Sequence, residues 1–180
     1  MLAMKSARLH GAQDIRFETV DAPSEPQDDQ VLLRVNSAGI CGSDIHNYRT
    51  GCWITRTPSI PGHEFAGEVE AVGPGVRSLK AGDRVVADSR YWCGACEACL
   101  SGRQHLCQTL GFVGEVCDGG FAEFARLPER LLMKIDPWVS MDVAATTEPL
   151  AVALHAVSRL EPQRGAPVLV TGCGMIGALS

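Results

Sequence analysis

The 180-residue sequence predicts a mainly β fold with a short α/β segment at its end. Short runs of alternating apolar and polar residues recur along most of the chain, and turn signals such as "GPG" and "AGD" separate them. Many short strands joined by such turns are typical of an all-β domain. A helical pattern and a glycine-rich turn follow only near the C-terminus. We therefore expect a β domain at residues 1–150, and a linker helix with the truncated start of a second domain at residues 151–180.

The predicted strands follow from their period-two alternation. In "VLLRVNSAGI", Val31, Leu33 and Val35 share one face, as in a half-buried strand. The run "EFAGEVEAVG" at 64–73 repeats this pattern, with Phe65 and Val69 on one face and glutamates on the other. We expect further strands at "DRVVAD", "FAEFARL" and "LLMKI", and an exposed loop at the polar, proline-rich "DAPSEPQDDQ".

Charge and hydropathy restrict the class of partner. The net charge is −5 at pH 7, the pI is near 5.5 and no run of Lys or Arg occurs. Little electrostatic attraction to nucleic acid or to an anionic membrane results, so we expect a small-molecule partner. No segment approaches the ~18 apolar residues of a membrane span, and the N-terminus turns polar before a signal-peptide core of ~7–15 residues is complete. We predict a cytoplasmic location.

A cluster of cysteines carries the strongest local signal. In the cytosol thiols stay reduced, so clustered cysteines are typical of metal sites rather than of disulfides. Gly94 and Gly102 allow the chain to fold back, and four thiolates close the tetrahedral shell of a structural Zn²⁺. The cysteine signature of a bacterial iron–sulfur cluster has a different last interval between cysteines and a proline after the last one, where this chain has Gln108. Four thiolates already complete the shell, so His105 is assigned to the loop. The cysteines, spaced C-x2-C-x2-C-x7-C, are Cys93, Cys96, Cys99 and Cys107.

A closed four-thiolate shell cannot take part in a reaction, so other residues must do so. Three segments offer metal-type donors at the end of an element: Cys41 follows the run 31–40, His63 and Glu64 begin the run 64–73, and Glu148 is the expected N-cap of a helix with Pro149 at its first position. Spacing alone does not join these segments. A buried thiol, a core imidazole and a capping carboxylate therefore stay open as alternatives.

The motifs as a set resemble the zinc-containing medium-chain alcohol dehydrogenase superfamily over essentially the whole sequence. The resemblance is closest to the branch of polyol, sorbitol, threonine and idonate dehydrogenases, and Gly42 and Glu148 carry that finer assignment. It implies an irregular, GroES-like β-barrel catalytic domain followed by the truncated start of a Rossmann domain. The matching blocks, in the family's order, are "ICGSDIH", "GHEFAGEVEAVGPGV", "AGDRV", the four-cysteine loop, "DGGFAEFA", "EPLAVALHAV" and "VLVTGCGMIG".

The resemblance implies a catalytic zinc bound by Cys41 and His63, with Glu64 or Glu148 as the third ligand and an open position for the substrate oxygen. It implies hydride transfer between a secondary alcohol, such as a polyol or sugar acid, and a nicotinamide cofactor. With the four-cysteine site, the expected content is two zinc ions per chain.

Three further residues acquire roles from the resemblance. Ser43 and His46 match a relay for the alcohol's proton, and Asp44 matches the carboxylate that orients a histidine ligand. From the residues alone, "GSD" at 42–44 is equally typical of a turn or a helix cap.

The end of the sequence predicts a nucleotide-binding turn. The run from Val168 to Thr171 predicts a strand, and Gly172, Gly174 and Gly177 follow it in G-x-G-x-x-G order. This pattern favours a dinucleotide cofactor, NAD or NADP. One βαβ unit needs about 30 residues or more. We therefore expect an N-terminal fragment of an enzyme about twice this length, inactive alone and, by the resemblance, a dimer or tetramer when whole.

Two other functions remain as alternatives. One is a non-catalytic, zinc-stabilised GroES-like module, and the other is a primary or aromatic alcohol dehydrogenase.

Overall fold

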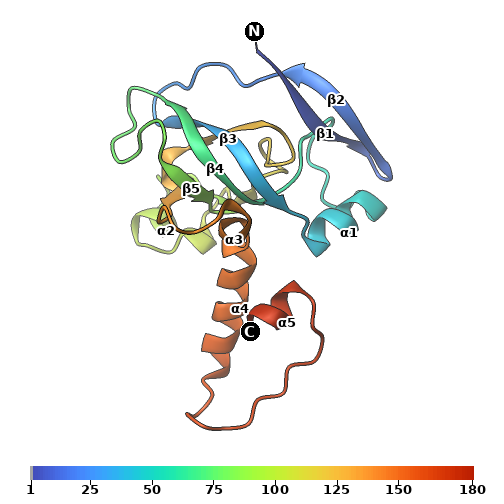
Figure 1. The fold of residues 1–180 in the computed structure, drawn as a ribbon, viewed down its shortest axis with the longest axis vertical. Coiled ribbons are helices and arrows are strands. Elements are labelled where there is room, and N and C mark those ends of the chain that lie inside the picture. The colour runs from blue at the N-terminus through green and yellow to red at the C-terminus, as the bar shows by residue number, and fades with distance from the viewer. Residues whose placement is uncertain (1) are drawn as a thin grey trace.

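The computed structural model describes residues 2–180 and confirms the mainly β prediction (Figure 1). None of the helices in these residues is both long and apolar enough to cross a membrane. The elements in chain order are β1 (Ala3–Gly11), β2 (Asp14–Asp21), β3 (Gln30–Gly39), α1 (Gly42–Thr50), β4 (Glu64–Val72), β5 (Arg84–Ala87), β6 (Arg90–Tyr91), α2 (Glu97–Leu100), η1 (Gln104–Leu106), β7 (Gly111–Phe112), β8 (Phe124–Pro128), η2 (Glu129–Leu131), β9 (Leu132–Lys134), α3 (Met141–Ala145), α4 (Thr147–Leu160) and α5 (Met175–Leu179).

A five-stranded antiparallel sheet forms the centre of the molecule, in the order β8-β3-β4-β5-β9. The five expected strand runs correspond to these five strands. In β3, Val31 and Leu33 are buried and Arg34 is exposed, as the alternation predicts. The register between β3 and β4 places Gly39 opposite Glu64. The C-terminal end of β3 therefore lies beside the N-terminal end of β4.

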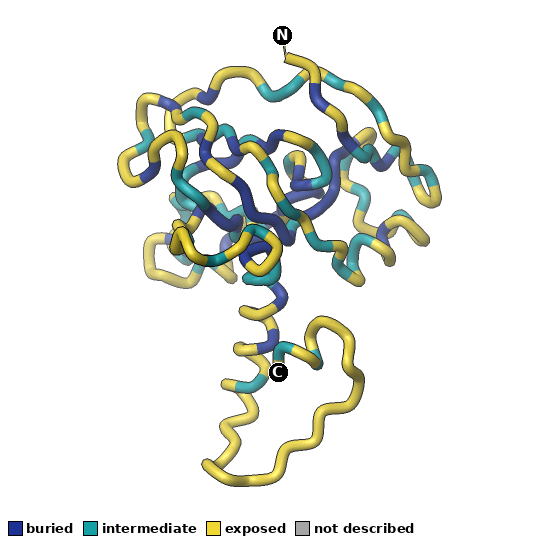
Figure 2. The backbone as a smooth tube through the Cα atoms, in the orientation of Figure 1, coloured by how far each residue is buried: buried dark blue, intermediate teal, exposed yellow. Residues whose placement is uncertain are grey.

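The main core is formed largely by buried residues of the strands of this sheet. Figure 2 shows the buried stretches concentrated in the central strands, whereas the C-terminal segment is almost entirely exposed. Burial of large apolar side chains is the main favourable contribution to the stability of such a domain. The fully buried members with the largest side chains are Phe65, Leu33, Leu127, Leu131, Val31, Val69, Val85 and Val113.

The N-terminal hairpin of β1 and β2 was not expected from the sequence. It forms a separate two-stranded sheet that hydrogen-bonds to two loops: the Ala7 amide donates to the Phe121 carbonyl (2.8 Å), and Leu9 and Ser59 exchange backbone hydrogen bonds (2.8 and 3.1 Å). Phe17 on β2 is 90% exposed. No residue of β2 is buried, so its sequence lacks the alternation of apolar and polar residues that predicts a strand.

The prediction that Glu148 is the N-cap of a helix is wrong. The helix α4 begins at Thr147, with Thr146 at the N-cap, so Glu148 and Pro149 lie within its first turn. The amides of the first turn have no partner in the helix, so proline is tolerated at several positions there and does not fix the start. Pro149 and Ala153 are the buried residues of α4. The helix starts before residue 150 and continues past it, so the boundary between domains at residue 150 stays a prediction.

The predicted strand from Val168 to Thr171 is also wrong: residues 161–174 contain no strand, and Leu169 is 87% exposed. A strand needs a neighbour to complete its backbone hydrogen bonds, and no strand of residues 2–180 pairs with this run. The helix α5 does begin after the glycine turn, as expected, and the segment returns to lie beside α4 (Figure 1).

Candidate functional site

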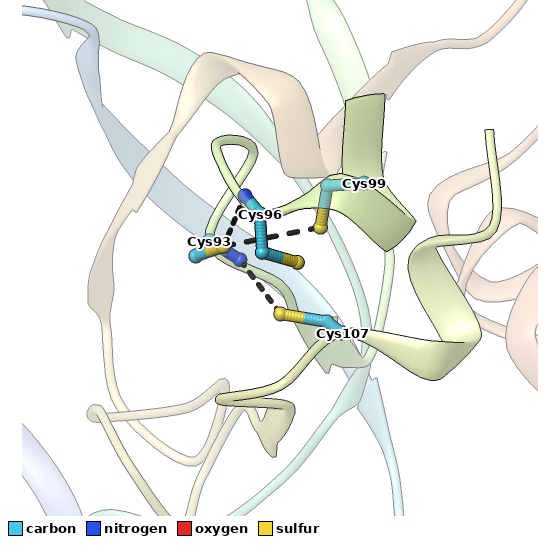
Figure 3. A group of neighbouring side chains, drawn as sticks. All are labelled: Cys93, Cys96, Cys99 and Cys107. Carbon is cyan, nitrogen blue, oxygen red and sulfur yellow. Dashed lines mark hydrogen bonds between the residues drawn. The ribbon is translucent and has the colours of Figure 1, made fainter. Parts of the chain in front are cut away.

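The four cysteines of the C-x2-C-x2-C-x7-C segment lie together in a lobe that projects from the sheet, and we call residues 91–112 the cysteine lobe. Their sulfur atoms all lie within 4.8 Å of one another (Figure 3). Gly94 (φ +78°) and Gly102 (φ +77°) occupy the left-handed region, which glycine adopts without a steric cost. Short helices, α2 and η1, carry Cys99 and lead into Cys107, respectively. His105 lies in η1 and outside the cluster.

The donor chemistry of the cysteine lobe fits a tetrahedral zinc ion. With Zn–S bonds of about 2.3 Å, a tetrahedral ion separates its sulfurs by about 3.8 Å. The Sγ atoms of Cys93 and Cys99 are 3.9 Å apart, and the amide of Cys93 donates to the Sγ of Cys107 at 3.3 Å (Figure 3). The cluster therefore needs little rearrangement to coordinate an ion.

The local electrostatics favour ionisation of some of these thiols. The backbone amides of Ala95 and Cys96 donate to the Cys93 sulfur and lower its pKa to about 6. The amide of Cys93 similarly lowers the pKa of Cys107. Burial instead raises the pKa of Cys99 to about 12. A thiolate is the form that binds metal, and a bound cation would offset the burial of Cys99 and the mutual repulsion of the thiolates.

One arginine fixes the lobe to the sheet. The Nε of Arg130, on η2, donates to the carbonyl of Trp92 (3.0 Å), and its guanidinium lies over the rings of Tyr91 and Trp92 at 5.6 and 5.5 Å. Its Nη1 forms an ion pair with Asp29 at 3.0 Å. Cation–π contacts of this kind contribute about 0.5–1 kcal/mol when exposed.

A second group of donors lies where β3 and β4 end side by side. Cys41 follows β3, His63 precedes β4 and Glu64 is its first residue, and one ligand atom from each lies within 4.8 Å of the others. We call these three residues the strand-end cluster. The 21 residues between Cys41 and His63 fold away as α1 and a loop, and the antiparallel register returns the chain to the same edge. One thiol, one imidazole and one carboxylate fit a catalytic type of zinc site, which keeps a fourth position open.

Gly39 makes room for the carboxylate of Glu64. A β-carbon at position 39 would lie 2.5 Å from the Oε2 of Glu64 and 3.3 Å from its Cβ. Glycine within a strand often marks such a close approach, so the sequence "SAGIC" did contain this signal. Glu64 is 8% exposed, and burial raises its pKa, against the lowering effects of the Cys41 thiol and His63.

Asp44 links the two halves of the strand-end cluster. Cys41 is the N-cap of α1, and the Oδ2 of Asp44 accepts a hydrogen bond from its backbone amide at 2.8 Å, as in a capping box. Its Oδ1 lies 3.8 Å from the Nδ1 of His63. Burial raises the pKa of Asp44, while the Cys41 amide and His63 lower it. The structure thus gives Asp44 the capping role and also places it beside a candidate ligand.

Glu148 lies outside the strand-end cluster. Its Oε1 accepts a hydrogen bond from the hydroxyl of Ser89 at 3.0 Å. Its charge nevertheless contributes to the raised pKa of Glu64, so it lies nearby. Ser89 is buried and no sequence signal pointed to it. The geometry therefore favours Glu64 over Glu148 as the third donor.

The two relay residues differ in their surroundings. Ser43 lines a small cavity together with Asp44 and His63. His46 is exposed on α1, and its ring lies 4.6 Å from the ring of Trp53. Neither contact tests a proton relay, which stays a prediction.

The glycine turn lines a cleft that reaches the chain neighbours of Cys41. Gly172 has φ +94°, and a β-carbon on Gly177 would lie 1.9 Å from the Gly172 carbonyl, so the turn requires glycine there. Gly174 is the N-cap of α5. These three glycines line a cleft of about 600 Å³ whose opposite wall includes Ile40 and Gly42, the neighbours of Cys41. A dinucleotide in this cleft would lie next to the residues that flank Cys41.

Comparison with known proteins agrees with this geometry. Residues 27–137 match the model of the alcohol dehydrogenase GroES-like domain. The chain is 38% identical to sorbitol dehydrogenase from Bacillus subtilis over 181 aligned residues, covering 98% of the chain and 51% of the relative. It is 36% identical to L-threonine 3-dehydrogenase from Idiomarina loihiensis, covering 97% and 51%. The chain spans about half the length of the curated relatives it matches.

Solved structures show the same similarity. The alcohol dehydrogenase RspB from Escherichia coli CFT073, in complex with NADH, superposes with a TM-score of 0.87 at 37% identity, covering 98% of the chain and 51% of RspB. The cobalt- and zinc-bound thermostable alcohol dehydrogenase from Pyrobaculum aerophilum superposes with a TM-score of 0.81 at 31% identity, covering 89% and 49%.

Proposed function

The chain belongs to the zinc-containing medium-chain alcohol dehydrogenase superfamily, in its polyol dehydrogenase branch, and from this membership we propose that it is the metal-binding part of a nicotinamide-dependent oxidoreductase. The substrate is a secondary alcohol such as a polyol or sugar acid. Because the chain spans about half of its relatives, the reaction is proposed for the whole protein. The observation that carries the proposal is the strand-end cluster beside the cleft of the glycine turn.

In this proposal Cys41, His63 and Glu64 hold a catalytic zinc ion. When bound, this ion supplies a Lewis acid that lets an alcohol ionise near neutral pH. One thiolate and one carboxylate carry two negative charges, which balance a divalent cation. Asp44 keeps the start of α1, and with it Cys41, in place through the 2.8 Å hydrogen bond to the Cys41 amide.

The remaining site residues have roles in proton transfer and cofactor binding. Ser43 accepts the proton of the substrate hydroxyl while its own proton passes through the cofactor or water to His46, which is exposed and releases a proton to solvent. Gly172, Gly174 and Gly177 accommodate the pyrophosphate of NAD or NADP. The NADH complex of RspB supports a nicotinamide cofactor. Glu148 is hydrogen-bonded to Ser89 and is not the third ligand. Its negative charge lies close enough to raise the pKa of Glu64.

The substrate class rests on the relatives. The two curated relatives are named for sorbitol and L-threonine, both of which carry hydroxyl groups. A small-molecule substrate also suits the acidic chain. The cysteine lobe holds a second, structural zinc ion, and the protein is a cytoplasmic homo-oligomer.

Metal stoichiometry tests the proposal. We expect elemental analysis to find two zinc ions per chain in the wild type and one in Cys41→Ser, with circular dichroism unchanged. For the whole protein, a panel of secondary, primary and aromatic alcohols with NAD and NADP identifies the substrate class from the rate of nicotinamide reduction. One zinc ion per chain in both the wild type and Cys41→Ser would favour the non-catalytic module. Faster oxidation of primary or aromatic alcohols would favour the other alternative.

A further inference from the structure

The outer edge of β2 has no neighbouring strand within residues 2–180. β1 and β2 form a two-stranded sheet at the edge of the molecule (Figure 1). The other side of this sheet is covered, because the backbone of β1 at Lys5, Ala7 and Leu9 forms hydrogen bonds with Ser59 and with residues 121–123. β2 is therefore the open side of the hairpin.

The register of the hairpin identifies the backbone groups on this open edge. In an antiparallel pair, opposite residues either exchange both of their backbone hydrogen bonds or point these groups away from each other. Ala7 and Leu9 direct their amides to the loops, so their partners on β2, Phe17 and Ile15, direct theirs outward. Thr19 follows the same pattern, since alternate residues of a strand point the same way. Three residues of β2 thus offer free amides and carbonyls.

The side chains of the same three residues are exposed. Phe17 is 90% exposed, Ile15 is 39% exposed, and Thr19 is exposed as well. They lie on one face of β2, because they are two residues apart. A strand edge of this length with apolar side chains is suited to pairing with a strand of another chain.

The charges of β2 complement those of a second, antiparallel β2. When Phe17 lies opposite the partner's Phe17, Arg16 lies opposite the partner's Glu18, and Glu18 opposite the partner's Arg16. Opposite charges on facing strands stabilise a pair, and like charges destabilise it. Moving the centre of the pair by one residue, to Arg16 or to Glu18, would place two like charges opposite each other. The sequence of β2 therefore favours one register with a second copy of itself.

We propose that β2 is a contact between two copies of this chain, whose β2 strands pair antiparallel about a two-fold axis at Phe17. Ile15, Phe17 and Thr19 then exchange the outward backbone hydrogen bonds, and the two hairpins form one four-stranded sheet. Because the loops cover the far side of each β1, the sheet ends at four strands and the contact is closed. The inference rests on the proposed function only for the expectation that copies of the chain associate.

Disulfide formation between copies of the whole protein tests this contact. In the proposed pair the two Cα atoms at position 17 are about 5.5 Å apart, and a disulfide spans about 4.4–6.8 Å. Pairing raises the effective thiol concentration from about 10 μM in solution to about 1 mM, so Phe17→Cys should cross-link about 100-fold faster than Trp138→Cys. Trp138 is 83% exposed and lies outside the hairpin. The wild type, with Cys52 and Cys173 exposed, measures the background.

Two further variants test the register. Two copies of Ile15 would lie about 14 Å apart across the two-fold axis, four residues along the strands, so Ile15→Cys alone should stay at the background. A mixture of Ile15→Cys and Thr19→Cys should cross-link, because these positions are opposite each other. Rapid cross-linking of Ile15→Cys with itself, or equal rates for Phe17→Cys and Trp138→Cys, would overturn the proposal.

Sedimentation of the whole protein measures the contact without a cross-link. Phe17→Lys places two like charges at the two-fold axis and should halve the mass of the oligomer, whereas Trp138→Lys should leave the mass unchanged. A Phe17→Lys variant that keeps the mass of the wild type would contradict the contact. Circular dichroism verifies that both variants fold.

The contact and the proposed reaction fail in different ways. Rapid cross-linking of Phe17→Cys, together with no alcohol oxidation by the whole protein, would support the contact and contradict the reaction. Alcohol oxidation by a wild type that sediments as a monomer would support the reaction and overturn the contact.

Discussion

The cysteine lobe and the strand-end cluster both bring metal-type donors within 4.8 Å of one another, but they do so by different means. The lobe takes all its donors from one segment, residues 93–107, which two left-handed glycines fold back on itself. The strand-end cluster takes its donors from the ends of two strands that the sheet aligns. The lobe has few apolar residues of its own, so we expect its structure to depend on a bound metal. The strand-end cluster is part of a packed sheet, so we expect its metal binding to depend on the structure of the sheet.

The largest expected effect is in the cysteine lobe. Because the binding energy of a structural metal is folding energy, Cys93→Ala should lose one metal ion and lower the free energy of unfolding by about 4 kcal/mol or more. Denaturant unfolding and elemental analysis measure the two changes. Cys52→Ala, which removes an exposed thiol outside both clusters, is the control. A Cys93→Ala variant with wild-type stability would remove the contrast between the two sites.

A smaller effect is expected at Gly39. In Gly39→Ala the new methyl group would meet the Glu64 carboxylate at 2.5 Å, and overpacking of this kind costs typically about 1–3 kcal/mol. The strand-end cluster should bind cobalt more weakly, while the lobe keeps its metal. Gly11→Ala, whose methyl group would meet no atom within 4 Å, is the control. Unchanged cobalt binding would mean that the carboxylate of Glu64 is not a ligand.

The smallest effect is a pH dependence. Burial raises the pKa of Glu64 in the folded chain. In protein stripped of its weakly held metal, the contribution of this group to stability is therefore greatest below about pH 4.3, the unfolded pKa, and is lost as the pH rises through the folded pKa. Glu64→Gln has no such loss, so the Tm of the variant minus that of the wild type should increase with pH. A difference that stays constant or decreases would contradict the burial of this charge.

The same distinction explains how much the sequence could predict. Alternation was sufficient for the strands that face the core, because burial of one face imposes it. The hairpin of β1 and β2 was missed, since Phe17 and its neighbours bury little. The strand from Val168 to Thr171 has the right composition but no partner strand within residues 2–180. The composition of a segment indicates its preference for a strand, but the strand forms only where a neighbouring strand completes its backbone hydrogen bonds.

The residues of the candidate site also differ in how far the sequence could predict them. The cysteine spacing was sufficient to group the four thiols, because their geometry is local. The sequence left Glu64 and Glu148 as equal candidates, because the choice depends on the register of β3 with β4 and on the hydrogen bond to Ser89. Ser89, the partner of Glu148, had no sequence signal, since it lies 59 residues earlier in the chain.

The exposed run at residues 168–170 has a practical consequence. Val168, Leu169 and Val170 are β-branched or aliphatic, uncharged and 58%, 87% and 43% exposed. Segments of this kind, with free backbone amides and carbonyls, template the stacking of identical chains. We therefore expect concentrated solutions of the isolated 180-residue polypeptide to precipitate over time. Fusion to a highly charged carrier, or a lysine in place of Leu169, would be the first remedy in preparing it for crystallisation.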